Sequence, residues 1–325
     1  MKKPGTQVTG NREKLEGRFS LILEDARGER SFYVGGFPFR ADQDSDFLRQ
    51  FDVGRGLTSD PIGPIRRPAE VFLGGAREWD GFNLCLARLQ KARKALQSLQ
   101  KWYESVVNDN SLSLPQAINS HEIFFNSQLI YLIALTDDKE DNLGHSQFVT
   151  AYALLLARAL GIEDDNFLTD LQRGALLHDI GKIGLPSSIL CKPGSLTPLE
   201  REIIKEHPLL GYQLLEDYPF LEGATDVVLY HHEWYNGQGY PFGLKGEEIP
   251  LAARIFSLAD TLDAILSDRP YRPGRSFELA SLEIEKGSGS QFDPAIVDVF
   301  LSIPEEQWRK ARRQALCLFR LPLVH

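Results

Sequence analysis

Histidines and carboxylates gather in one stretch of this sequence of 325 residues. Five of its seven histidines fall between His145 and His232. His178 and Asp179 are adjacent at the point where an expected helix stops just before Gly181, and the negative end of a helix dipole favours a bound cation there. Imidazole and carboxylate groups together are ligands for divalent transition metals, and one carboxylate can bridge two ions. The pattern favours a metal centre.

The remaining histidines of the stretch also stand near expected helix ends. His207 lies at a helix break that the following proline imposes. His231 and His232 close a short helical run, before a turn rich in glycine. His145 opens an apolar helix and points toward the core, where a single histidine would more often be an ordinary buried residue.

Asp260 interrupts a strongly apolar helix over residues 251–266, LAARIFSLADTLDAIL. An ionised carboxylate in such surroundings costs several kcal/mol unless it is paired or bound to a metal. Its partner is therefore either a cation such as Arg254 or a metal ion shared with the histidines.

The elements that must hold these groups are helices. Helical periodicity dominates from residue 120 onward, and no strand pattern is evident there. Thr197 and Glu200 form a capping box, which predicts a helix start at that point. We therefore expect residues 120–325 to form an all-α domain.

The motifs in this domain, in their order, resemble the HD-GYP family of metal-dependent phosphohydrolases over about residues 120–305. This resemblance implies an all-helical HD fold. It also implies hydrolysis of the second messenger cyclic di-GMP to pGpG or on to GMP, by a metal-activated hydroxide. The motifs are His145, His178-Asp179-x-x-Lys182, His207, His231-His232-Glu233, Gly239-Tyr240-Pro241, Asp260, Arg269-Pro270-Tyr271-Arg272 and Gln291-Phe292-Asp293-Pro294.

The resemblance also implies a set of metal ligands. One metal would be held by His145, His178, Asp179 and Asp260. Asp179 would bridge to a second metal, whose further ligands would be His207, His231 and His232. Mixed imidazole and carboxylate ligation suits iron or manganese.

A third metal is a separate expectation. Some family members have a glutamate four residues before the first histidine, and Asp141 stands at that position here. A polar turn around Asp141 favours two metals per chain, and a helical turn would allow a third.

Substrate contacts follow from the same resemblance. Lys182 would meet the scissile phosphate, and the guanidinium groups of Arg269 and Arg272 could bind phosphate or guanine. Tyr240 could stack on a guanine or contact a protein partner such as a diguanylate cyclase domain. In the loop after the histidine pair, Trp234 and Asn236 depart from the usual family residues.

Two other functions remain open. The chain could be a catalytically silent receptor or signalling adaptor for cyclic di-GMP, although the complete ligand set favours an enzyme. It could also be an HD phosphohydrolase that acts on another cyclic dinucleotide.

The amino-terminal part differs in character. We expect residues 1–80 to form a small α+β regulatory domain. Two short apolar runs, near Leu21–Leu23 and Phe32–Val34, indicate a β-hairpin there. This domain resembles a short ligand-sensing GAF domain through Gly54-Arg55-Gly56-Leu57 and Arg66–Val71.

A connector helix and linker are expected over residues 81–119, before the HD-GYP domain of residues 120–325. The helix carries an apolar stripe at heptad spacing, which includes Leu89, Leu96 and Leu99. The stripe predicts either a helix packed on its own domain or a homodimer through paired helices.

Composition excludes several classes of protein. The net charge of −9 argues against binding a nucleic acid polymer through a broad basic surface. Three cysteines without a CxxC pair predict neither a disulfide framework nor a thiolate zinc site, which suits a reducing cytoplasm. No apolar segment is long enough for membrane insertion, so we expect a cytoplasmic protein.

Overall fold

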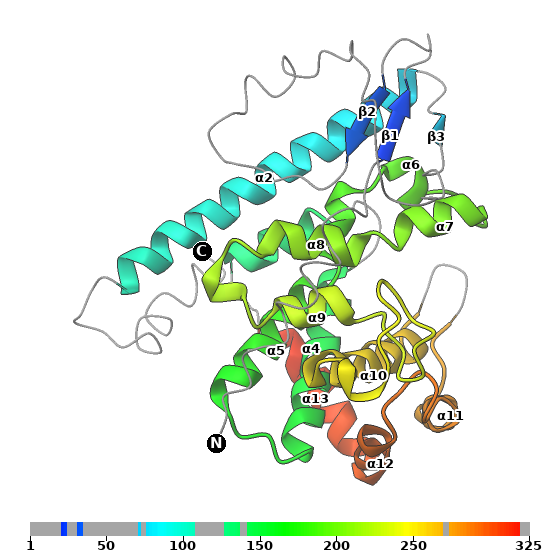
Figure 1. The fold of residues 1–325 in the computed structure, drawn as a ribbon. Helices are drawn as coiled ribbons and strands as arrows, with labels where there is room; N and C mark the ends of the chain where they lie inside the picture. The colour runs from blue at the N-terminus through cyan, green and yellow to red at the C-terminus, as the bar shows by residue number, and fades with distance from the viewer. Residues whose placement is uncertain are drawn as a thin grey trace. The chain divides into compact units, whose positions relative to one another are not determined.

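The computed structural model describes residues 21–24, 31–34, 71–72, 76–107, 127–136, 142–268 and 273–318. The chain divides into two compact units, residues 1–83 and 84–325 (Figure 1). Asp141, Arg269 and Arg272 lie outside the described residues, as do the segments around Gly54 and Arg66 that resemble a GAF domain.

The first unit contains a small sheet. Strand β1 (Leu21–Glu24) pairs antiparallel with β2 (Ser31–Val34), with Leu21 opposite Val34, which confirms the two expected hairpin strands. Strand β3 (Val71–Phe72) pairs in parallel with β1, and the strand order is β2-β1-β3.

The regular elements in the described part of the second unit are all helices, apart from two isolated bridges, so the all-α expectation is confirmed there. A further helical stretch covers residues 127–134. The elements are α2 (Ala76–Val107), which begins in the first unit, α4 (Asn142–Ala159), α5 (Asp165–Leu177), η1 (Ile180–Gly184), α6 (Ser187–Leu190), α7 (Pro198–Ile204), α8 (His207–Leu215), η2 (Pro219–Leu221), α9 (Thr225–Tyr230), η3 (Gly246–Glu248), α10 (Leu251–Leu266), α11 (Phe277–Lys286), α12 (Pro294–Ser302) and α13 (Glu305–Leu318).

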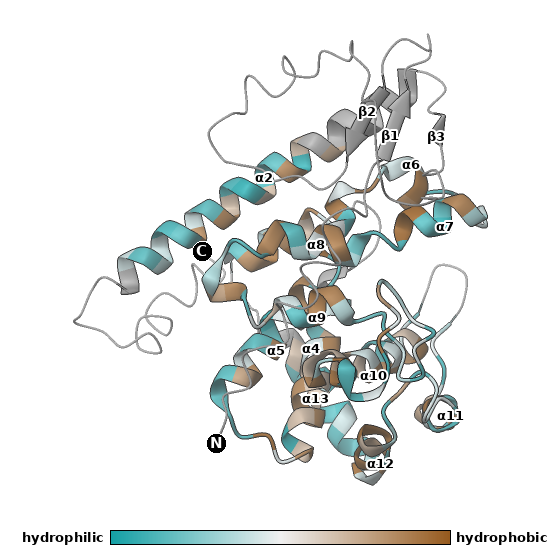
Figure 2. Cartoon of the chain, in the orientation of Figure 1, coloured by the Kyte–Doolittle hydropathy of each residue, from teal (hydrophilic) through white to brown (hydrophobic). Residues whose placement is uncertain are grey.

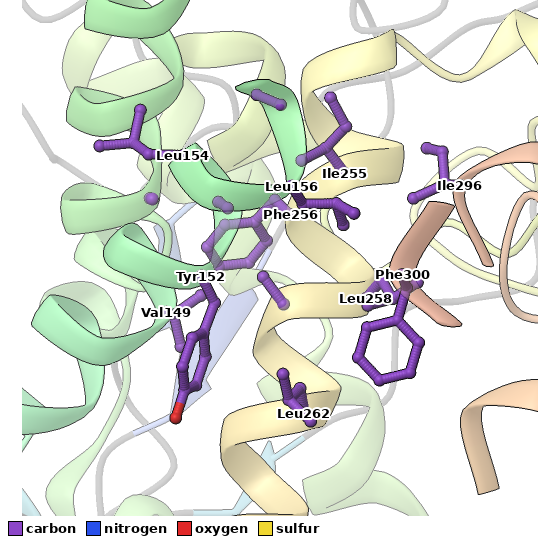
Figure 3. Close-up of a cluster of buried hydrophobic side chains, with 14 of the residues drawn as sticks. Val149, Tyr152, Leu154, Leu156, Ile255, Phe256, Leu258, Leu262, Ile296 and Phe300 are labelled. Atoms are coloured by element: carbon purple, nitrogen blue, oxygen red, sulfur yellow. The ribbon is translucent and has the colours of Figure 1, made fainter. Parts of the chain in front are cut away.

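The main core of this unit lies where α4, α10 and α12 meet. Tyr152 and Leu156 of α4 and Phe256 and Leu262 of α10 are buried, with Phe300 of α12 beside them (Figure 3). The apolar residues that predicted helices therefore face one another and fix α4 against α10. These two helices carry His145 and Asp260.

Helix α2 buries its apolar stripe within its own chain. Leu96 and Leu99 are fully buried against Leu129 and Leu132, in a second core that also includes Phe220. Hydrophilic residues recur between the hydrophobic ones along the helix (Figure 2). Leu96 and Leu99 therefore have the packed arrangement, which is one of the two that the stripe predicted. A homodimer through this helix stays a prediction.

Two smaller features bear on the local structure. The expected capping box at Thr197 and Glu200 is present and begins α7. On α9, burial and then the neighbouring charges of Asp170 and Glu222 raise the pKa of Asp226 to about 6.

No helix in the described ranges combines the length and the apolar character that a bilayer crossing needs.

Candidate metal centre

Six helical elements deliver the histidines and carboxylates to one place. His178 is the C-terminal cap of α5, Asp179 is the N-terminal cap of η1, and His207 is the first residue of α8. His231 caps the end of α9, directly before His232. His145 on α4 and Asp260 on α10 complete the set.

Gly181 allows two of these elements to meet. A Cβ atom at this position would lie 1.9 Å from the main-chain oxygen of His207 and 2.5 Å from the main-chain nitrogen of Gly211. The start of η1 can therefore pack directly on the first turn of α8 only because residue 181 has no side chain. This contact brings Asp179 close to His207.

The side chains form two groups that could each hold a metal ion. His145, His178 and Asp260 make the first group, and His207, His231 and His232 make the second. Within each group the candidate ligand atoms all lie within 4.8 Å of one another. His178, His207 and His231 are buried, which removes these imidazoles from competing water.

Asp179 lies between the two groups and touches both. Its Oδ2 atom is 3.1 Å from Nε2 of His178, and its Oδ1 atom is 3.2 Å from Nε2 of His207. Burial by itself would raise the pKa of Asp179, but Lys182 and His178 outweigh it and hold the pKa well below its usual range. The side chain is therefore a carboxylate with one oxygen directed at each group.

The histidine tautomers indicate that the second group fits a cation. Nδ1 of His207 lies 2.7 Å from the carbonyl oxygen of Ile204, and Nδ1 of His231 lies 3.0 Å from that of Val228. A carbonyl oxygen only accepts hydrogen bonds, so both Nδ1 atoms carry hydrogen and, in neutral rings, both Nε2 atoms carry lone pairs. These two Nε2 atoms are only 3.1 Å apart. Two facing lone pairs at this distance need a proton or a metal ion close to both.

The electrostatics of this group favour the metal over the proton. Burial, followed by the nearby His232, lowers the pKa of His231 well below its usual range. Burial and His207 likewise lower the pKa of His232 to about 3. Neutral imidazoles are the form that binds metals.

The first group has the opposite character, because His145 lies between two carboxylates, Asp260 of the group and Asp263 outside it. Nε2 of His145 lies 3.2 Å from Oδ1 of Asp260, and its Nδ1 lies 2.7 Å from Oδ2 of Asp263. Burial lowers the pKa of His145, but the hydrogen bonds to Asp260 and Asp263 outweigh it and raise the pKa to about 10. Burial opposes ionisation of Asp260, yet His145 brings its pKa to about 2. Two carboxylates around one imidazole require a positive charge, which a proton or a metal ion can supply.

Asp260 thus has the partner that its apolar helix required. The alternative partner, Arg254, is engaged elsewhere: its NH1 group lies 2.5 Å from Oδ2 of Asp293. Asp293 in turn accepts from the main-chain N–H of Ala295 at the start of α12.

Lys182 reaches the centre from η1. Its Nζ donates to Oδ2 of Asp179 at 2.7 Å, and its side chain is 27% exposed. The lysine therefore stands at the edge of the site, next to the carboxylate that contacts both groups.

Tyr240 also borders the second group. Its ring stacks on His232 with a centroid distance of 4.6 Å, so one face of the tyrosine is covered. Burial and then the carboxylates of Asp179 and Asp260 raise the pKa of its phenol, which stays protonated.

The function of Glu233 depends on contacts that the sequence does not reveal. This carboxylate is buried and accepts hydrogen bonds from the main-chain N–H groups of Phe242, Gly243 and Leu244, at 2.7, 3.1 and 3.0 Å. It fixes the loop that follows Tyr240. Asp263 is not among the site residues predicted from the sequence, although it interrupts the same apolar helix as Asp260 only three residues later.

Comparisons with known proteins agree with this geometry. A family model described as "HD domain" matches residues 129–296. A "Cyclic di-GMP phosphodiesterase" of Thermotoga maritima is 41% identical over 172 residues, which are 52% of this chain and 46% of the relative. A protein of the same name from Vibrio cholerae is 39% identical over 193 residues, or 55% of this chain and 39% of the relative.

A third relative has a different printed substrate. The "3'3'-cGAMP-specific phosphodiesterase 3" of Vibrio cholerae is 38% identical over 151 residues, or 46% of this chain and 33% of the relative. The match covers less than half the length of each of these three relatives.

Proposed function

This chain belongs to the HD domain family, and we propose that it is a metal-dependent phosphodiesterase that hydrolyses cyclic di-GMP to pGpG or GMP. The family match is in line with the motifs that resemble HD-GYP proteins. The choice of substrate is supported by relatives named cyclic di-GMP phosphodiesterases, at 39% to 41% identity.

One observation carries the proposal: the carboxylate of Asp179 lies between two groups of metal-binding side chains and directs one oxygen to each. We propose that His145, His178 and Asp260 hold one ion and that His207, His231 and His232 hold the other. Asp179 is then the shared ligand. Mixed imidazole and carboxylate ligation suits iron or manganese.

Two bound divalent ions would supply a strong water-derived nucleophile near neutral pH and positive charge for the phosphodiester. The protein's own residues bind and orient the substrate. Lys182 places its ammonium group beside Asp179, where it can neutralise charge that develops on a phosphate oxygen. Glu233 keeps the loop after Tyr240 in place along one side of the second group.

The experiment is product chromatography with protein purified without oxygen and loaded with Mn²⁺ or Fe²⁺. Cyclic di-GMP should disappear and pGpG or GMP should form. Asp179→Asn should abolish turnover, because the amide cannot serve two cations as a carboxylate does. The matched control is Asp298→Asn, at an exposed position of α12. Full activity of Asp179→Asn would contradict the proposal.

A second candidate substrate has a specific observation behind it. The relative named for 3'3'-cGAMP is 38% identical, which is close to the value for the cyclic di-GMP relatives. The same chromatography with both dinucleotides, compared by kcat/KM, decides between them. Binding of either dinucleotide by metal-loaded protein without any turnover would instead support the silent receptor.

A protein partner is a further part of the proposal. Trp234 follows the histidine pair and is 37% exposed. It provides an apolar contact beside the loop of Tyr240, at which a diguanylate cyclase domain could bind.

A further inference from the structure

Asp263 is a fully buried carboxylate behind the metal centre, and it belongs to neither of the two metal groups. Its exposed fraction is 0%. Oδ2 lies 2.7 Å from Nδ1 of His145, and Oδ1 accepts from NH1 of Arg312 at 2.7 Å and from Oγ of Ser267 at 3.0 Å. A buried carboxylate needs such partners, because an unpaired charge in the interior is strongly destabilising.

The contact to Nδ1 of His145 differs from those of three other histidines of the two metal groups. Nδ1 of His178, His207 and His231 meets a main-chain carbonyl oxygen, at 2.9, 2.7 and 3.0 Å. Nδ1 of His145 meets a carboxylate, which is a stronger acceptor. A carboxylate behind an imidazole fixes its tautomer and orientation and makes its other nitrogen a better metal ligand.

Arg312 holds that carboxylate from the carboxyl-terminal helix α13. Its guanidinium group also donates to the hydroxyl of Tyr152 at 3.1 Å and to Oγ of Ser267 at 2.9 Å. Its Cζ lies 4.0 Å from the centre of the Phe148 ring. Arginine suits this position because its planar fork can bind several acceptors at once.

Helix α13 lies beyond the part of the chain that matches the HD domain model, which ends at residue 296. Trp308 anchors the helix on the core, with ring contacts to Tyr152 at 5.7 Å and to Phe300 at 5.2 Å. Arg312 therefore sits on a helix that is held in place independently of its own polar contacts.

We propose that Asp263 and Arg312 are positioning residues for the metal centre, and that α13 is consequently part of that centre. Arg312 orients Asp263, Asp263 orients His145, and His145 then presents Nε2 to the ion that it would share with His178 and Asp260. This inference rests on the metal groups of the proposed function. It concerns the first group alone, so it predicts that the affinity for the ion in that group depends on α13 and that the affinity for the other ion does not.

The test is Mn²⁺ binding to metal-free protein, measured by electron paramagnetic resonance of the free ion. Arg312→Gln and Asp263→Asn are compared with wild type. The matched control is Arg313→Gln, because Arg313 is the neighbouring arginine of α13 and its exposed side chain pairs only with Glu306 among the described contacts. The melting temperature of each metal-free protein reports on folding.

Loss of such an outer hydrogen bond typically weakens metal affinity about 10- to 100-fold. We expect Arg312→Gln and Asp263→Asn to weaken one of two Mn²⁺ dissociation constants by about 10-fold or more. The second constant should stay within about twofold, and Arg313→Gln should change neither.

Two results would overturn the inference. One is a lower melting temperature of Arg312→Gln with both Mn²⁺ constants unchanged, which is what a purely structural contact predicts. The other is equal weakening of both constants. If Arg312→Gln does not fold, Asp263→Asn, which keeps the volume of the side chain, decides by the same criteria. Wild-type protein that binds two Mn²⁺ but cleaves no cyclic dinucleotide would remove the proposed function and leave this inference standing.

Discussion

Replacing Lys182 with methionine should slow hydrolysis while the metals stay bound. The lysine lies outside both metal groups, yet its Nζ is 2.7 Å from Oδ2 of Asp179. A phosphate that reached ions on both sides of Asp179 would therefore pass close to this ammonium group. The substitution removes the positive charge and keeps most of the apolar stem.

The size of the effect follows from the position of the charge. Loss of one preorganised group that stabilises a developing negative charge costs about 2 to 4 kcal/mol of barrier. The Lys182 side chain is 27% exposed, so water partly replaces it and the lower half of that range applies. The barrier should therefore rise by about 2 to 3 kcal/mol, and at about 1.36 kcal/mol per factor of ten kcat should fall about 30- to 160-fold.

Lys192 provides a closely matched control. Its Nζ also lies 2.7 Å from a carboxylate oxygen, that of Glu200, and its side chain is 31% exposed. Lys192→Met therefore loses a comparable ion pair away from the metal centre. The assay is kcat for cyclic di-GMP, with the metal content of the same samples measured by atomic emission.

Two outcomes would refute this reasoning. Equal kcat in wild type and Lys182→Met would show that the lysine does not meet the reacting phosphate. A fall in kcat that matched a fall in bound metal would show that Lys182 acts only by keeping Asp179 ionised. Lys192→Met should leave both quantities unchanged.

Three further predictions concern folding and the shape of the site. Asp226 has a folded pKa of about 6 against an ordinary value of 3.8, so its ionisation opposes folding. The resulting loss of folding stability begins near pH 4 and is complete above about pH 6. Measured by urea unfolding, Asp226→Asn should raise the free energy of unfolding by at most about 3 kcal/mol at pH 7.5 and by almost nothing at pH 4. Gly181→Ala should displace the start of α8 and remove bound metal, because the new Cβ would lie 1.9 Å from the main-chain oxygen of His207. Gly184→Ala is the control and should retain the metal, because its nearest contact would be a side-chain carbon of Leu210 at 3.3 Å. Leu96→Asp should unfold the domain at temperatures where wild type is folded, by circular dichroism, since the residue is fully buried within the chain; a folded variant with a lower oligomeric state would instead support paired connector helices.

Much of the candidate metal centre could be predicted from the sequence because most of its candidate ligands stand at helix ends. Glycine, proline and the change from apolar to polar residues mark those ends locally, so the positions of His178, His207 and His231 were readable. The apolar residues on both sides of Asp260 were enough to infer that its carboxylate has a strong partner. Which partner it has depends on the packing of α4 against α10, and the structure decides for His145 over Arg254.

Residues that act across long sequence separations could not be predicted in this way. Arg312 follows Asp263 by 49 positions and reaches it only because α13 packs on α4 through Trp308. No local pattern distinguishes Arg312 from its neighbour Arg313, although one is tied into the interior and the other is exposed. The function of Glu233 depends on three main-chain N–H groups, which leave no mark in the sequence.

The apolar stripe of α2 shows a different limit. Heptad spacing specifies that one face of the helix must be covered, but not by what. Leu96 and Leu99 are covered by Leu129, Leu132 and Phe220 of the same chain. A preference between the two arrangements required knowledge of the second core.

The central claim is that Asp179 is shared by two metal ions, each held by one of the two side-chain groups. Anomalous diffraction at the metal absorption edge, on crystals loaded with Mn²⁺ or Fe²⁺, tests it most directly. We expect two peaks about 3.5 to 4 Å apart, one beside His145, His178 and Asp260 and the other beside His207, His231 and His232, with a carboxylate oxygen of Asp179 bound to each ion. A single peak, or two peaks of which either is out of reach of Asp179, would contradict the claim.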